Sequence, residues 1–356
     1  MKILFLSDAL SYHTQRWVNY FVGKGHLCFL ATLDRGLKTK ATEYLIPSPK
    51  LPNFMRYPLA LPRVRNLVKQ IQPDLINAHY IPSYGLLGAK LKFHPLVIST
   101  WGSDVLISPG KSWLHRKRTM YVLEKADLVT TDAHFTSEAI YRLGVEREKV
   151  IQSPMGVERN LLSPQKREEK QYWVIMSNRK LEPLYDVVTF IKAIPLVLNR
   201  TEREIKFLVL GNGSQKGDVM NLARRLQIEN RIEFKGVVSR EMLMRTYEES
   251  DIYVSTSKSD STSVSLLEAM SFGSIPVVTD IPGNREWIED GVNGFIFPIS
   301  DYKTLSERIV HLIDGSADYT GIREKNRSII QKRAVWENNM QVIEESFCRL
   351  VNRNKS

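Results

Sequence analysis

Short apolar segments of four to seven residues alternate with helical stretches along almost the whole 356-residue chain. Such an alternation is typical of α/β folds, in which helices cover mostly parallel sheets. The polar segment 163–171 divides the apolar segments into two sets, and each set is expected to form its own Rossmann-like sheet. The expected strands are 2–7, 27–33, 74–78, 96–100, 128–131 and 150–153 in the first set, and 172–177, 206–211, 232–236, 252–255 and 275–279 in the second.

The length of the chain predicts two domains, because a single hydrophobic core rarely grows beyond about 250–300 residues. Its 43% hydrophobic and 25% charged residues are ordinary for a globular protein. We expect one domain over residues 1–165 and a second over residues 166–335, with segment 163–171 as the linker. No apolar run approaches the roughly 20 residues of a membrane span, and the first residues predict a strand rather than a signal peptide, so a cytoplasmic location is expected.

Positive charge is concentrated in the first half of the chain. Residues 1–165 contain 22 Lys and Arg against 12 Asp and Glu, whereas the remainder contains 28 against 27. This asymmetry suggests an anionic partner such as membrane lipid or a phosphorylated acceptor, although solubility alone also explains it. Segments 53–58, 62–65 and 111–118 mix basic with apolar residues, which suits either an anionic membrane surface or a solvated helix face. Nucleic acid is not expected as a partner, because no recognition module accompanies the charge.

Two carboxylates lie eight positions apart in segment 257–280, at Asp260 and Glu268. The run of Ser and Thr before the apolar LLEAM predicts a helix that begins near Ser263 or Ser265 and ends at the next glycine. The first backbone N–H groups of such a helix can bind a phosphate without a metal. A second interpretation is open, in which Ser265 and Glu268 form a capping box and Asp260 is an ordinary turn residue.

Ligands of open parallel sheets bind beyond the carboxyl ends of the strands, so the other turns that follow strands also deserve a search. In the first half, one such turn carries His13 and another carries Trp101 and Asp104. A tryptophan ring can hold a sugar by stacking on its C–H face, and a carboxylate can bond sugar hydroxyls. The alternative roles are a helix cap for His13 and a core position for Trp101.

In the second half, the turn after the first strand carries Arg179 and Lys180. Two adjacent cations at the end of a strand can bind an anionic group such as a phosphate. Later turns carry Gly211 and the pair Val237 and Val238, which are weak signals by themselves. No His, Cys and carboxylate spacing is typical of a metal site, so neither a metal nor another cofactor is expected.

These turns together resemble the motifs of the family-4 glycosyltransferases, and the resemblance extends over almost the whole chain. It rests on SDSTSVSLLEAMSFGSIPVV at 259–278, on the turns at 179–180, 210–213 and 234–241, and on IPGNREWIEDGVNGFIFP at 281–298. It implies an α/β protein with two facing Rossmann-like domains and parallel sheets, the GT-B fold. It also implies that the helical stripe at 336–351 crosses back, so that residues 336–356 return to the first domain.

The resemblance further implies a retaining, metal-independent glycosyltransferase. Its donor would be a nucleotide-sugar, linked to UDP or GDP, and its acceptor a glycan, a lipid-linked sugar or a small molecule. The implied residues are Asp260, Arg179 and His13 for catalysis; Arg179, Lys180, Gly211, Val237, Val238, Ser263, Val264, Ser265 and Glu268 for the donor, with Glu268 on the ribose; and Trp101 and Asp104 for the acceptor.

Two departures from the family pattern keep other functions open. The first acid is Asp260 rather than Glu, and Leu184 stands where the family has a second cation, five positions after Arg179. A donor-binding subunit with little or no turnover would tolerate both changes. A nucleotide-sugar epimerase or a phosphorylase on the same fold is a further alternative.

Overall fold

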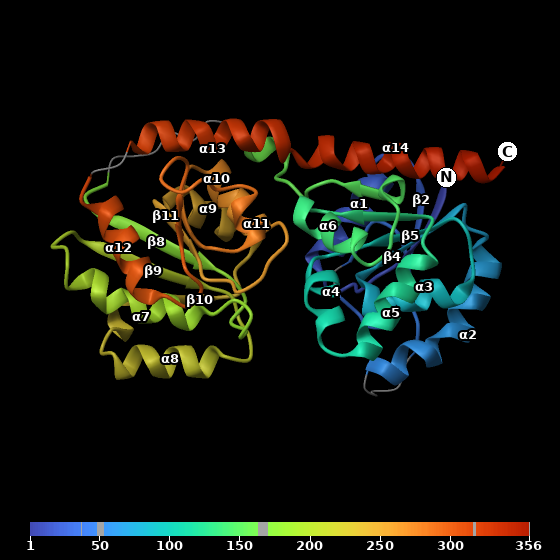
Figure 1. Cartoon of the computed structure of the whole chain (residues 1–356), viewed down its shortest axis with the longest axis horizontal. Coiled ribbons are helices and arrows are strands. Elements are labelled where there is room, and N and C mark those ends of the chain that lie inside the picture. The colour runs from blue at the N-terminus through green and yellow to red at the C-terminus, as the bar shows by residue number, and fades with distance from the viewer. Residues whose placement is uncertain (37, 48–52, 163–169, 316–317, 356) are drawn as a thin grey trace. The chain divides into compact units, whose positions relative to one another are not determined.

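The computed structural model describes residues 1–356 except 37, 48–52, 163–169, 316–317 and 356. The chain forms two compact units (Figure 1): unit 1 comprises Met1–Pro154 and Asn338–Ser356, and unit 2 comprises Met155–Glu337. Most of the linker expected at 163–171 lies outside the described residues, so this prediction stays untested.

Unit 1 is built on a seven-stranded sheet in the order β3-β2-β1-β4-β5-β6-β7, and all neighbouring strands pair in parallel. The strand order reverses between β1 and β4, and open parallel sheets bind their ligands at such a reversal. The strands are β1 (Lys2–Leu6), β2 (Leu27–Thr32), β3 (Thr42–Leu45), β4 (Leu75–His79), β5 (Leu96–Ser99), β6 (Leu128–Thr131) and β7 (Val150–Gln152).

Helices cover the sheet of unit 1, and the last helix of the chain is one of them. On α14, Phe347 is fully buried and its ring stacks on that of Phe21, with 5.2 Å between the centroids. The expected return of the C-terminal helix to the first domain is therefore confirmed. The helices are α1 (Tyr12–Gly23), α2 (Asn53–Ile71), α3 (Leu86–Leu91), α4 (Ser103–Leu106), α5 (Trp113–Glu124), α6 (His134–Tyr141) and α14 (Trp336–Lys355), with a π-helical turn at Tyr80–Gly85 and short 3-10 turns at Ser108–Gly110 and Arg147–Lys149.

Unit 2 contains a six-stranded sheet in the order β10-β9-β8-β11-β12-β13, again parallel throughout. Here the strand order reverses between β8 and β11. The strands are β8 (Trp173–Asn178), β9 (Ile205–Leu210), β10 (Ile232–Gly236), β11 (Ile252–Ser255), β12 (Ile275–Thr279) and β13 (Phe295–Phe297).

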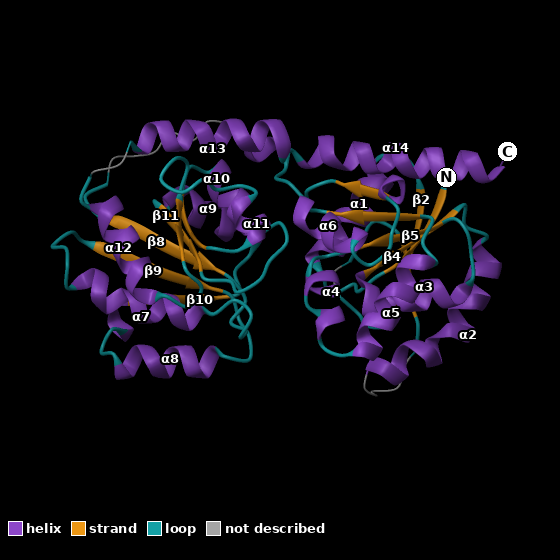
Figure 2. Ribbon diagram, in the orientation of Figure 1, coloured by secondary structure: helices purple, strands orange, loops and turns teal. Residues whose placement is uncertain are grey.

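Two hydrophobic layers enclose this second sheet, one on each face. Figure 2 shows α7, α8 and α12 against one face and α9, α10 and α13 against the other. The strands are continuous apolar runs because both of their faces are buried. The helices are α7 (Val187–Leu198), α8 (Lys216–Arg225), α9 (Arg240–Glu249), α10 (Val264–Ser271), α11 (Pro282–Arg285), α12 (Tyr302–Ile313) and α13 (Tyr319–Arg333), with 3-10 turns at Arg159–Leu161 and Glu229–Arg231.

Candidate functional site

The carboxyl ends of β8 and β11 bring together the residues that the sequence predicted for the diphosphate. Arg179 follows β8 directly, and its guanidinium Nη1 donates hydrogen bonds to the Oγ atoms of Ser263, at 2.6 Å, and Ser265, at 3.0 Å. Its Nη2 donates to the carboxylate of Asp260 in an ion pair. The Tyr185 ring packs on the guanidinium, with 4.4 Å from Cζ to the ring centroid. Two segments far apart in sequence, the turn after β8 and the loop after β11, therefore meet at one cation.

The electrostatics of this cluster keep Arg179 charged. Burial acts to lower the pKa of the guanidinium, but the neighbouring Asp260, Tyr253 and Tyr185 outweigh it and raise the pKa above its ordinary value. The side chain is only 9% exposed, and its Nε is buried without a hydrogen bond in the described part of the chain. A buried donor of this kind usually has a partner, and a bound anion would supply one.

Helix α10 begins at this cluster, at the position that the sequence predicted. Ser263 is its N-cap residue, and the Ser263 Oγ accepts a hydrogen bond from the backbone N–H of Leu266. A capping box would need its acid three positions after the cap, and that position is Leu266. The capping-box interpretation of Ser265 and Glu268 is therefore wrong, and the free N–H groups of the first turn lie beside Arg179.

Glu268 lies one helical turn beyond Ser265 on α10 and is buried, with 2% of its surface exposed. Its Oε1 accepts a hydrogen bond of 2.6 Å from Nη1 of Arg240, a residue that the sequence analysis did not identify. The hydroxyl of the buried Tyr247 accepts from Asn178 at 3.0 Å. Burial, and then the charge of Glu268, raise the pKa of Tyr247. The residue expected on the ribose is thus part of a polar network inside unit 2.

Two glycines hold the Arg179 turn in place by close backbone contact. Gly211 has a φ of +113°, and a Cβ added there would lie 2.4 Å from the carbonyl oxygen of Arg179. A Cβ added to Gly213 would lie 2.3 Å from the carbonyl oxygen of Leu181. Any side chain at either position would push the turn away, so the Gly-x-Gly motif positions Arg179.

The remaining predicted donor residues lie nearer the surface. Lys180 is exposed, Val237 is 79% exposed, and Val238 packs against the core of unit 2. Leu184, which replaces the second cation of the family pattern, accepts a hydrogen bond of 2.8 Å at its carbonyl oxygen from the backbone N–H of Lys258. This hydrogen bond joins the turn that carries Leu184 to the loop that carries Asp260.

In unit 1, the structure brings His13 and Trp101 together around His79, a third residue that the sequence analysis missed. The Trp101 ring lies 5.3 Å from the ring of His13 and 5.4 Å from that of His79, between centroids. His79 bonds Ser7 Oγ through Nδ1, at 3.0 Å, and Asn77 Oδ1 through Nε2, at 2.9 Å. Complete burial, with a smaller contribution from His13, lowers the pKa of His79 to about 3, so its ring is neutral.

Asp104, which we expected to bind the acceptor, is enclosed by the protein. It is fully buried, its Oδ2 accepts from the backbone N–H of Ile81 and its Oδ1 from that of Trp101, each at 3.0 Å. Burial raises the pKa of Asp104 to about 6, although these backbone hydrogen bonds oppose the shift. The carboxylate thus ties two strand-end loops together, because their N–H groups would otherwise be buried without an acceptor.

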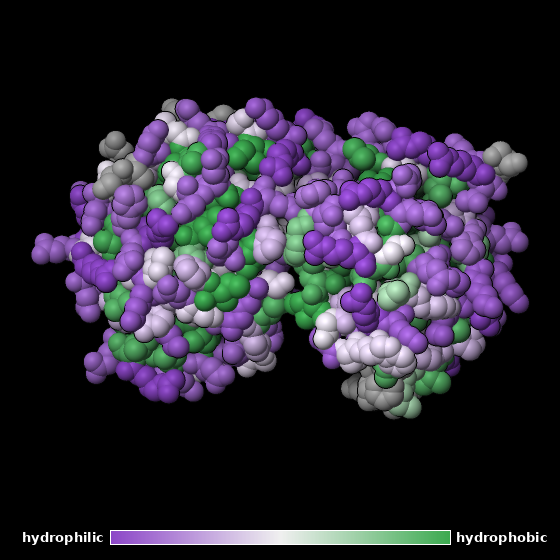
Figure 3. All heavy atoms as spheres, viewed as in Figure 1, coloured by the Kyte–Doolittle hydropathy of each residue, from purple (hydrophilic) through white to green (hydrophobic). Residues whose placement is uncertain are grey.

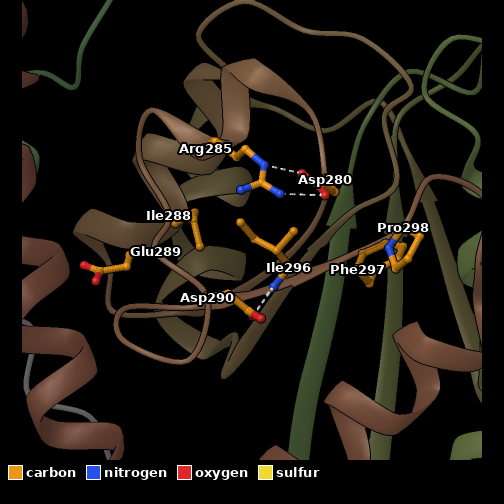
Figure 4. Close-up of a pocket in the computed structure, with 8 residues that line it drawn as sticks. All are labelled: Asp280, Arg285, Ile288, Glu289, Asp290, Ile296, Phe297 and Pro298. Carbon is orange, nitrogen blue, oxygen red and sulfur yellow. Dashed lines mark hydrogen bonds and ion pairs between the residues drawn. The ribbon is translucent and has the colours of Figure 1, made fainter.

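A surface pocket of about 400 Å³ lies near the ends of β12 and β13 (Figure 4). Arg285 pairs with Asp280 across it, and Asp290 accepts a 2.8 Å hydrogen bond from the backbone N–H of Ile296. None of the predicted site residues lines this pocket, and we assign it no function. Over the described residues, no group of three His, Cys, Asp or Glu side chains could hold a metal ion, and no helix is both long and apolar enough to cross a membrane.

Comparisons with known proteins agree with this architecture. The model for "glycosyl transferases group 1" matches residues 158–333, and the model for "glycosyl transferase 4-like" proteins matches residues 2–133. The N-acetyl-alpha-D-glucosaminyl L-malate synthase of Bacillus anthracis is 23% identical over 299 residues, which are 78% of this chain and 75% of that protein. An uncharacterized glycosyltransferase of Methanocaldococcus jannaschii is 24% identical over 246 residues, 63% of this chain and 62% of its own length.

Among solved structures, the Anabaena protein Alr3699/HepE in complex with UDP-glucose matches with a TM-score of 0.82 and 19% identity, over 98% of this chain and 100% of the other. The two parallel-sheet units thus have the GT-B fold. The chain belongs to the family of group 1 and 4-like glycosyltransferases, so the resemblance seen in the sequence is confirmed.

Proposed function

We propose that this glycosyltransferase transfers a sugar, with retention of anomeric configuration, from a nucleotide-sugar bound by unit 2 to an acceptor bound by unit 1. The observation that carries the proposal is the Arg179 cluster at the start of α10. A buried guanidinium beside free helix N–H groups suits a diphosphate, because guanidinium and phosphate form strong, often bidentate hydrogen bonds and the helix dipole attracts the same charge.

Each charged residue of the site has a role in this proposal. Arg179 and the N–H groups of α10 stabilise the negative charge that develops on the leaving diphosphate. Asp260 contacts the transferred sugar, and Glu268 accepts hydrogen bonds from the ribose hydroxyls. The bond between the sugar and the diphosphate breaks, the bond to the acceptor oxygen forms on the same face, and the departing phosphate takes the acceptor proton. Lys180, exposed beside Arg179, adds positive charge.

A UDP-linked donor is the first choice to test. The HepE structure contains UDP-glucose, and the names of two relatives include UDP-N-acetylglucosamine. In unit 1, the partly buried His13 and Trp101 offer a ring surface, and the uncharged Trp101 Nε1 donor has no hydrogen-bond partner among the described residues. Such groups suit the hydroxyls of a glycan, a lipid-linked sugar or a small polar acceptor.

We also propose that unit 1 contacts an anionic membrane surface through α5. Trp113 and Leu114 are 64% and 68% exposed at the start of this helix, and the Lys117 ammonium lies 4.2 Å from the Trp113 ring centroid. The sequence contains no Asp or Glu from 105 to 123. Figure 3 shows hydrophilic residues over most of the face drawn, with hydrophobic residues among them. Aromatic and basic residues together are typical of segments that rest in a lipid headgroup region.

The proposal is tested by incubating the protein with a panel of UDP- and GDP-sugars, without and with candidate acceptors, and following the products by NMR. We expect binding of one donor, slow hydrolysis of it alone, and transfer with retained configuration when a suitable acceptor is present. Conversion of the sugar without acceptor would identify an epimerase, and cleavage that needs inorganic phosphate would identify a phosphorylase.

The alternative of a donor-binding subunit without turnover has its own test. If the wild-type chain turns over poorly and the Leu184→Lys, Asp260→Glu double variant is active, the subunit is the better description. If the wild type transfers sugar efficiently, that alternative is excluded. A chain that binds none of the nucleotide-sugars would contradict the proposal itself.

A further inference from the structure

Arg240 bridges two carboxylates beside the proposed donor site, although the sequence analysis assigned it no role within the turn at 234–241. Its Nη1 donates to Oε1 of Glu268 at 2.6 Å, and its Nη2 donates to Oε2 of Glu158 at 3.0 Å. Arg240 is the first residue of α9, and Ser239 caps this helix by accepting from the backbone N–H of Met242. A cation at a helix N-terminus is unfavourable to the helix dipole. Its placement therefore calls for an explanation other than the stability of α9.

The partner of Arg240 within α10 is nearly inaccessible to water. The Glu268 side chain is 3% exposed, whereas that of Arg240 is 33% exposed. A buried carboxylate stays ionised only when a charge or hydrogen bonds compensate its loss of water. Arg240 supplies that charge through a short hydrogen bond, and its planar guanidinium also fixes the direction in which the carboxylate plane points.

We propose that Arg240 is a positioning residue for the donor ribose. It holds the Glu268 carboxylate ionised and oriented, so that this group accepts hydrogen bonds from the ribose hydroxyls and distinguishes ribonucleotide from 2′-deoxyribonucleotide donors. This inference rests on the proposed function of Glu268. A purely structural role predicts a different result. If the Arg240–Glu268 pair only joined α9 to α10, breaking it would lower the affinity for ribonucleotides and for 2′-deoxyribonucleotides equally.

The test measures dissociation constants by calorimetry for UDP and GDP, each against its 2′-deoxy analogue. The variants are Arg240→Gln and Glu268→Gln. The matched control is Arg245→Gln, because Arg245 lies on the same helix and pairs with Glu241 at 2.8 Å on the exposed surface. We expect the wild type and the control to prefer the ribonucleotide by about tenfold or more, the effect of one lost hydrogen bond to a charged group. Both site variants should lose most of that preference.

The outcomes separate the inference from the proposed function. If Glu268→Gln keeps the preference for ribose, Glu268 does not hold the ribose and both ideas fail. A second outcome is that Glu268→Gln loses the preference while Arg240→Gln keeps it. A third is that Arg240→Gln weakens the binding of the ribonucleotide and of its 2′-deoxy analogue by the same factor. Either of these overturns the role of Arg240 and leaves that of Glu268 standing.

The Arg240→Gln variant leaves the buried Glu268 carboxylate without this cation, which can destabilise the fold. A double variant controls for that effect. Removing both charges together avoids that uncompensated charge. The Arg240→Gln, Glu268→Gln double variant is expected to bind each nucleotide as the Glu268→Gln variant does, because Arg240 acts through Glu268. A further loss of affinity in the double variant would show that Arg240 acts on the nucleotide directly and would overturn the inference.

Discussion

The two sheets of this protein carry different side chains at equivalent places, the carboxyl edges where their strand order reverses. Where the strand order reverses in unit 2, the carboxyl edge carries a buried ion pair between Arg179 and Asp260. Where it reverses in unit 1, the same edge carries neutral groups, with His79 bonded to Ser7 and Asn77. The same architecture therefore carries a buried ion pair at one edge and a neutral, fully hydrogen-bonded histidine at the other.

Asp104 shows that a charged residue in the sequence need not leave its charge available to a ligand. Unit 1 has this carboxylate close to its sheet edge, but the carboxylate is committed to the backbone N–H groups of Ile81 and Trp101. In unit 2, by contrast, Arg179 has a buried Nε without a protein partner among the described residues. Unit 1 also leaves a buried donor without a partner among the described residues, the Nε1 of Trp101, so the two edges differ in the charge of the unused donor.

The largest expected effect comes from removing the cation of the charged edge. Arg179→Gln should lower kcat/KM for the donor by about 10²–10³, as the loss of one group that stabilises transition-state charge typically does. Lys180→Gln is the matched control, because it removes an adjacent but exposed charge. Steady-state kinetics of donor hydrolysis or transfer measure both. Equal losses in the two variants would contradict a special role for the buried cation.

A smaller effect is expected from disturbing the backbone that carries Arg179. Gly211→Ala places a Cβ against the Arg179 carbonyl oxygen at a φ of +113° and should destabilise unit 2 by roughly 2–3 kcal/mol. Gly217→Ala is the control, since Gly217 lies in α8 with nothing within 4 Å of an added Cβ. Alanine there should stabilise the helix by up to about 1 kcal/mol. Urea unfolding compares the two, and equal destabilisation would refute the argument.

The neutral His79 at the carboxyl edge of the unit 1 sheet should make the free energy of unfolding depend on pH. His79 has a folded-state pKa of about 3 against an ordinary value of 6.5, so between these values only the unfolded chain binds the proton. Stability is therefore lost as the pH falls, by about 2 kcal/mol from pH 6.5 to pH 5. The raised pKa of Asp104 acts in the opposite direction over part of this range, so the comparison must be made with a variant.

The variant for this comparison is His79→Asn, which keeps a neutral polar group but cannot titrate. Between pH 6.5 and pH 5, the wild type should lose about 2 kcal/mol more of its free energy of unfolding than the variant, measured by urea titration. The contribution of Asp104 is common to both chains and cancels. Identical pH dependence would mean that His79 is not held neutral by the fold.

The smallest effect concerns the basic surface of unit 1. The Trp113→Ser, Leu114→Ser double variant should partition about tenfold less onto vesicles that contain anionic lipid. Ile299→Ser is the control, because Ile299 is an exposed apolar residue of unit 2. Cosedimentation with anionic and with zwitterionic vesicles measures the effect. Binding that is insensitive to the double substitution would exclude α5 as the contact.

Much of the fold could be predicted from the sequence because the strands are buried on both faces. All eleven expected strands are present, each within one residue of its expected bounds at either end. Two strands were missed. β3 has only four residues, of which three are exposed, at the edge of its sheet. β13 has three residues, too few for a pattern to emerge.

The site was partly predictable for a related reason. Arg179 and Ser263 each follow a strand, and neighbouring parallel strands end at the same edge, so their meeting could be expected. The roles of Arg240 and His79 could not be predicted, because they depend on partners 28 and 72 residues away in the chain. The available hints were that Arg240 lies in the turn at 234–241 and that His79 directly follows the predicted strand 74–78. The burial of Asp104 depends on N–H groups of a distant loop and could not be foreseen from its turn.

The most direct test of the central claim is hydrogen exchange, followed by mass spectrometry, on the wild-type protein with and without saturating UDP. If the charged edge of unit 2 binds the diphosphate, UDP should slow exchange in segments 179–184 and 257–268. Slowed exchange confined to segments 7–14 and 77–81 of unit 1, with 179–184 and 257–268 unchanged, would contradict the assignment of the donor to unit 2.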